Sequence, residues 1–119
     1  MEAEDIVPVQ LRPAIRQLVH ELVVGNFIGL EAGGRAGRLS AEDLRRVLSR
    51  YGRILVDLPA HAFDVEYAGA IAVDSDEAIW AVDVALWTAE EGRSDLTLQV
   101  TARTLANSVL VWIEDLHVL

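Results

Sequence analysis

Apolar and polar residues alternate along three consecutive stretches of the second half of the chain: residues 78–88, 95–103 and 108–119. A period of two predicts antiparallel β-strands with one face buried and the other more polar. The predicted buried face carries, from the first two stretches, Trp80, Val82, Val84, Leu86, Leu96, Leu98, Val100 and Ala102. An earlier strand is expected within residues 63–73, after a brief extended segment at 54–59 that Pro59 ends.

In the last stretch, residues 108–119, apolar residues fall on both faces of the predicted strand. Strict alternation puts Leu110, Trp112, Leu116 and Val118 on one face with Glu114, and Val109, Val111 and Ile113 on the other with Asp115 and His117. Both faces are then apolar at first and polar near the end, so the outer sheet face should carry Ile79, Trp87 and some of these valines. A partly apolar outer face is typical of a subunit interface, which predicts a homodimer formed through this face.

The first half of the chain predicts helices. Apolar residues recur every three or four positions between residues 9 and 24, and Gly25-Asn26 follows as a stop signal. Residues 27–30 should form a short apolar turn, and the Gly-rich stretch 31–39 a flexible loop. Ser40, followed by an acid three residues on, is typical of a helix N-cap, and Gly52 of the end of that helix.

These elements predict a single α+β domain over residues 1–119, with a flexible tail at 1–7. The N-terminal helices should pack on one face of a curved antiparallel sheet of about four strands.

Charge is unevenly distributed. Residues 1–60 hold eight acids and eight arginines, whereas residues 61–119 hold eleven acids against Arg93 and Arg103 alone, so the second half carries the whole net charge of −9. An acidic sheet argues against nucleic acid and anionic membranes as partners, and one interpretation of it is a basic protein partner. The alternative interpretation is that the acidic residues only keep the protein soluble.

The chain has no cysteine and therefore no disulfide or thiolate site. It also has no apolar run of membrane-spanning length and no basic, apolar leader at the start, so a cytoplasmic protein is expected. We expect no metal and no cofactor.

Four segments carry a family resemblance: GRLSAEDLRRVLSRYGRILVDLP, WAVDVALWT, EEGRSDLTLQV and the terminal IEDLHVL. They resemble an uncharacterised bacterial domain family of the NTF2-like, cystatin-like α+β type. The resemblance implies a curved sheet that forms a cone with the helices. It also implies that an Asp inside the cone can act as a base in catalytic members.

Asp83 is the residue that this resemblance singles out, in mid-strand between two valines. A base there needs partial desolvation and a donor for the developing oxyanion, for which Tyr67, Trp87 and His117 are candidates. A structural carboxylate paired across the sheet, for example with Arg103, explains the same residue. Asp115 and His117 are two residues apart in a strand and should point to the same side, as a carboxylate–imidazole pair or as a surface pair at the sheet rim.

Three hypotheses follow from these residues. The first is a non-catalytic binding or dimerisation module, for which Trp87, Arg103 and Tyr67 are the candidate binding residues. The second is an immunity-like protein that neutralises a basic effector by charge complementarity. The third is a small-molecule isomerase, dehydratase or hydrolase that uses Asp83, with His117 and Asp115 as further catalytic candidates.

Overall fold

The computed structural model describes residues 6–74, 76 and 78–119 of the chain. It confirms the α+β class: helices from the N-terminal half pack against a curled antiparallel sheet that forms a half-barrel. The tail expected over residues 1–7 lies mostly outside the described residues. Of its two described residues, Val7 is fully buried.

Four helical segments precede the sheet. A 3₁₀ turn, η1 (Val9–Leu11), leads into α1 (Arg12–Val23), where Pro13 is tolerated because it sits in the first turn. Residues 27–32 form a helix, α2 (Phe27–Ala32), where a turn was expected. The third helix, α3 (Ala41–Tyr51), starts at the predicted N-cap: the Ser40 hydroxyl accepts from the Asp43 N–H, and the Asp43 carboxylate accepts from the Ser40 N–H. Gly52 ends α3 in the left-handed conformation.

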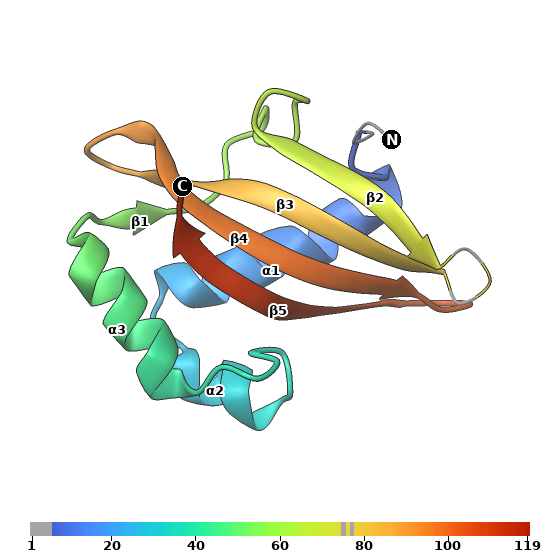
Figure 1. The fold of residues 1–119 in the computed structure, drawn as a ribbon, viewed down its shortest axis with the longest axis horizontal. Coiled ribbons are helices and arrows are strands. Elements are labelled where there is room, and N and C mark those ends of the chain that lie inside the picture. The colour runs from blue at the N-terminus through green and yellow to red at the C-terminus, as the bar shows by residue number, and fades with distance from the viewer. Residues whose placement is uncertain (1–5, 75, 77) are drawn as a thin grey trace.

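The sheet has two long central strands, β3 (Ile79–Thr88) and β4 (Gly92–Thr104), with β5 (Val109–Val118) on the far side of β4. Both β1 (Leu55–Val56) and β2 (Ala68–Asp74) pair antiparallel with β3, at Trp87–Thr88 and at Ile79–Val84 respectively. β1 and β2 therefore occupy the same edge of β3, one after the other. Figure 1 shows α1 crossing behind the sheet, while the opposite sheet face carries no helix.

Burial follows the predicted alternation in the central strands. Val82, Val84, Leu96, Leu98 and Val100 are at most 1% exposed and pack in one cluster with apolar side chains of α1. The α1 members of that cluster that are completely buried are Ile15, Leu18 and Val19. Burying a large aliphatic side chain contributes roughly 1.5–3 kcal/mol, so this layer is the main source of stability.

The faces predicted for the last strand were wrong, and a β-bulge is the reason. The β4–β5 register shifts between Gln99 and Val100, which pair with Asp115 and Ile113, so Glu114 is an extra residue on β5. Val111, Ile113 and Leu116 all face the core as a result, although strict alternation separates Leu116 from the other two. The outer face carries Ile79, Trp87, Leu110 and Trp112 in place of the valines.

The Gly-rich segment after α2 is held on the free edge of β5. The N–H of Ile113 donates to the carbonyl of Arg35 at 2.7 Å, and Gly37 lies directly against the Ile113 carbonyl. The Arg35 guanidinium donates two hydrogen bonds to Glu21 of α1, which is 7% exposed, and Asn26 donates a third. Mobility of residues 31–39 stays a prediction, but these contacts favour an ordered segment.

We predict that Glu21→Gln lowers the free energy of unfolding by about 2 kcal/mol at neutral pH, because it leaves the Arg35 guanidinium without its carboxylate. The hydrogen bonds from Arg35 hold the pKa of Glu21 below its ordinary value, against the effect of burial. The carboxylate therefore stabilises the fold at neutral pH, and this contribution is lost as the pH falls through the lowered pKa. Urea titration at a series of pH values measures the difference. Glu42→Gln, which breaks an exposed pair with Arg45, is the control and should change stability much less.

A second prediction concerns the contact between the Gly-rich segment and β5. Gly34 and Gly37 both have positive φ, at 76° and 63°. A methyl group at Gly34 meets nothing within 4 Å, whereas one at Gly37 overlaps the backbone of Ile113. Gly34→Ala should cost about 1 kcal/mol for its backbone conformation alone, and Gly37→Ala about 2 kcal/mol more. Equal losses in thermal unfolding would show that the segment does not rest on β5.

Candidate functional site

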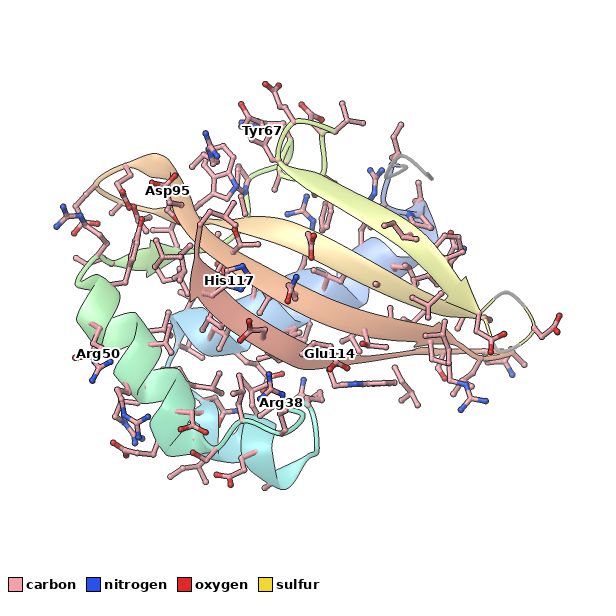
Figure 2. All side chains as sticks on the ribbon, viewed as in Figure 1. Arg38, Arg50, Tyr67, Asp95, Glu114 and His117 are labelled. Atoms are coloured by element: carbon pink, nitrogen blue, oxygen red, sulfur yellow. The ribbon has the colours of Figure 1, made fainter. Side chains whose placement is uncertain are left out.

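The helix-free face of the sheet holds a depression of about 250 Å³ that collects most of the polar candidates. We call it the sheet depression. Its lining includes Tyr67, Asp83, Arg93, Thr97, Gln99 and His117. Figure 2 shows Tyr67 and His117 near the same end of the sheet, while Arg38 and Arg50 lie on the side of α2 and α3.

Strand register places these residues in two neighbouring rows across the four strands. One row runs Gly69, Asp83, Gln99 and Asp115, from β2 to β5. The next row runs Tyr67, Ala85, Thr97 and His117. Tyr67 belongs to this row because its carbonyl accepts a hydrogen bond from the Ala85 N–H at 3.0 Å. Direct cross-strand neighbours have Cβ atoms about 5 Å apart.

Asp83 lies between a glycine and an amide in its row, and it is half-buried. Within the described part of the chain its carboxylate has no hydrogen bond or ion pair. The cross-strand pair with Arg103 that the sequence suggested is not formed by the register, because Arg103 lies opposite Ile79 and Leu110, four residues along β4 from Gln99. Asp83 is therefore a partly desolvated carboxylate without a partner among the described residues.

Asp115 and His117 do point to the same side. The His117 Nδ1 lies 3.1 Å from an Asp115 carboxylate oxygen, although at an angle that makes no hydrogen bond. Because β4 separates β3 from β5 and His117 stands in the next row, the backbones of Asp83 and His117 are about 12 Å apart. Asp83 and His117 thus contribute to one depression but do not form a hydrogen-bonded dyad.

Trp87 and Tyr67 belong to an aromatic cluster beside the depression. Trp87 packs edge-on against His61 and Tyr67, with ring centroids 5.1 and 5.2 Å away, and His61 also contacts Tyr67 at 5.8 Å. Such contacts restrain the rings, so Trp87 supports Tyr67 from behind and does not line the depression itself.

The sequence reasoning did not select several residues of the site, among them Gly69, Arg93 and Gln99. Gln99 could have been found, because it stands on the polar face of the strand after Asp83. Gly69 and Arg93 carry no periodic signal, and their position depends on the strand register.

No group of three or more His, Asp or Glu side chains among residues 6–74, 76 and 78–119 is arranged to hold a metal ion. Over the same residues, every helix is too short or too polar to cross a membrane.

Comparison with known protein families gives a match over most of the chain. The model of a domain family described as a domain of unknown function, DUF7668, matches residues 19–119, which include the end of α1, α2, α3 and the whole sheet. No curated protein and no solved structure matches significantly.

We predict that Asp83→Asn leaves the free energy of unfolding within about 0.5 kcal/mol of the natural protein, because no described partner is lost. Chemical denaturation beside Glu21→Gln measures this. A loss above about 2 kcal/mol would show instead that the Asp83 carboxylate holds the fold together.

Proposed function

The chain belongs to the DUF7668 family, and because that family has no assigned function we propose one from the sheet depression. The protein is a non-catalytic binding module that holds a basic partner protein, receiving a lysine or arginine side chain of the partner beside Asp83. Such a protein would be immunity-like, neutralising a basic effector in the cytoplasm.

The observation that carries this proposal is that the Asp83 carboxylate is half-buried and has no partner among the described residues. A half-buried carboxylate has lost part of its hydration, and a cation that fills the depression would replace that lost interaction. Gln99 beside it and Tyr67 in the next row offer further oxygen atoms to a bound ammonium or guanidinium group.

Arg93 also lines the depression, but the other charges around it support the same chemistry. In the helical half of the chain, acidic residues form ion pairs with arginines: Glu42 with Arg45 and Asp43 with Arg46. On the sheet side, the carboxylates of Asp64, Glu66 and Asp95 have no ion pair with a described residue. An unneutralised acidic surface accelerates association with a cationic protein and makes it sensitive to salt.

We also propose that the apolar end of the same face joins two copies of the chain. Ile71 and Leu110 are 38% and 49% exposed there, and the half-buried Trp112 lies close to Leu110 on β5. Large apolar side chains gathered on one sheet face favour contact with another protein surface. This end of the sheet lies away from His117 and Tyr67, so both contacts are possible at once.

The catalytic alternative, an isomerase, dehydratase or hydrolase, would use the same carboxylate as a base. It needs an oxyanion donor close to the reacting atom. His117 is two strands away, the Trp87 ring packs against Tyr67 and His61, and the space between helices and sheet is filled by the core. Asp83 faces an open depression, which suits a partner side chain better than an enclosed substrate.

We predict that Asp83→Asn weakens binding of a lysine-rich peptide about tenfold at 50 mM salt, because the partly desolvated carboxylate contributes more than a surface acid. Fluorescence anisotropy with a labelled seven-residue peptide of alternating lysine and valine measures the affinity. Asp95→Asn removes the same charge from an exposed strand position outside the depression and is the matched control, with an expected change below about threefold. Equal effects of the two substitutions would overturn the role of the depression and leave only a general electrostatic attraction.

A further inference from the structure

The sheet depression contains a cation as well as carboxylates. Arg93 lines it together with Asp83, and the exposed Glu66 also contributes to the lining. Within the described part of the chain, the Arg93 guanidinium forms no ion pair with either acid. Opposite charges that share a depression without pairing can each receive a group of the same ligand, so the depression suits a ligand that carries both signs of charge.

Strand register separates the two charges along the sheet. Arg93 on β4 lies opposite Trp87, which is four residues from Asp83 on β3. At about 3.3 Å per residue, the backbone positions of Asp83 and Arg93 are about 13 Å apart along the strands. Asp83 therefore stands at one end of the depression and Arg93 at the other.

The sheet surface between these two ends carries short side chains. Ala85 and Thr97 lie opposite each other there, and they are 9% and 7% exposed. Tyr67 and His117 stand on either side of this pair, in the same row, and both line the depression. The depression is thus elongated along β3 and β4, with a floor of short side chains, two larger side chains beside it and opposite charges at its ends.

The size of the depression limits the ligand. Its volume of about 250 Å³ is below the roughly 300–1,000 Å³ of pockets that enclose drug-sized molecules. A single lysine residue carries its ammonium group at the end of a long side chain. If the residue is the last of its chain, it also carries a free carboxylate. It can therefore reach Asp83 and Arg93 at once, whereas an internal lysine offers nothing to Arg93.

We propose that the sheet depression receives the C-terminal residue of the basic partner, a lysine. Its ammonium group lies beside Asp83, its side chain crosses Ala85 and Thr97, and its terminal carboxylate accepts a bidentate pair of hydrogen bonds from the Arg93 guanidinium. Capture of a C-terminal carboxylate is a recurrent mode of peptide recognition. This inference rests on the proposed function of Asp83 and deepens it. Free lysine carries the same two charges and is the second source of this chemistry.

The test compares two forms of the seven-residue lysine–valine peptide, labelled at its N-terminus and ending in lysine. One form has a free C-terminal carboxylate and the other a C-terminal amide. General attraction to a protein of net charge −9 favours the amide, because the amide form is more positive. The proposal predicts the opposite order, with the free acid binding about tenfold more tightly at 50 mM salt. Fluorescence anisotropy on the unaltered protein measures both affinities.

A pair of arginine variants assigns the preference to its residue. Arg93→Gln should abolish the preference for the free acid and leave the affinity for the amide within about threefold. Arg50→Gln removes the same charge from an exposed position on α3, which Figure 2 shows away from Tyr67 and His117, and it should keep the preference. A preference that survives Arg93→Gln would overturn the role of Arg93.

The outcomes separate this inference from the proposed function. Equal affinities, or tighter binding of the amide, would overturn capture of the carboxylate. The receiving role of Asp83 would still stand if Asp83→Asn weakened binding of both peptides. If Asp83→Asn weakened neither peptide, the proposed function would fail whichever form bound more tightly. No binding by either peptide would overturn both proposals.

Unlabelled free lysine, added as a competitor, identifies the source of the ligand. We expect that free lysine displaces the labelled free-acid peptide only at concentrations about a hundredfold higher than the unlabelled peptide needs, because the remaining lysines of the peptide also contact the acidic surface. Displacement at equal concentrations would show that the depression binds the free amino acid, and it would overturn the C-terminal residue of a protein as the ligand.

Discussion

Burial of one sheet face against α1 is the constraint on which the rest of the structure depends. The apolar rows of β3 and β4 and the side chains of Ile15, Leu18 and Val19 belong to one buried cluster. Since the helices of the described residues lie on that side or at the β5 edge, none of them covers the other sheet face. The surfaces available to a partner are thus a consequence of how the core is built.

Polar contacts secure the arrangement where the apolar layer ends. Glu21 holds Arg35 and Asn26, and thereby fixes the segment that covers β5. A nearly buried ion pair is expensive to assemble, but once its hydrogen bonds are complete it defines one geometry. Glu21, the one buried carboxylate among the described residues, therefore helps to close the β5 edge of the sheet.

The candidate site was only partly predictable. Asp83, Tyr67 and His117 were selected from the sequence and do line one depression, and Asp115 adjoins them. Arg103 was selected as well but belongs to the other end of β4, and Trp87 supports Tyr67 from outside the depression. The local sequence determines which residues of a strand share a face. The neighbours of a residue on the adjacent strands depend on the register in which the strands pair.

The sequence by itself determined the class of fold, the capped helix after Ser40 and the buried faces of the two central strands, because these follow from local periodicity and backbone preference. Only the tertiary structure decided which residues of β5 face the core, because the bulge at Glu114 turns Leu116 back toward it. It also decided which edge is covered and that Asp83 faces Gly69 and Gln99. Each of these is a relation between segments far apart in the chain, and such relations are set by the packing of the whole sheet and not by any one stretch of residues.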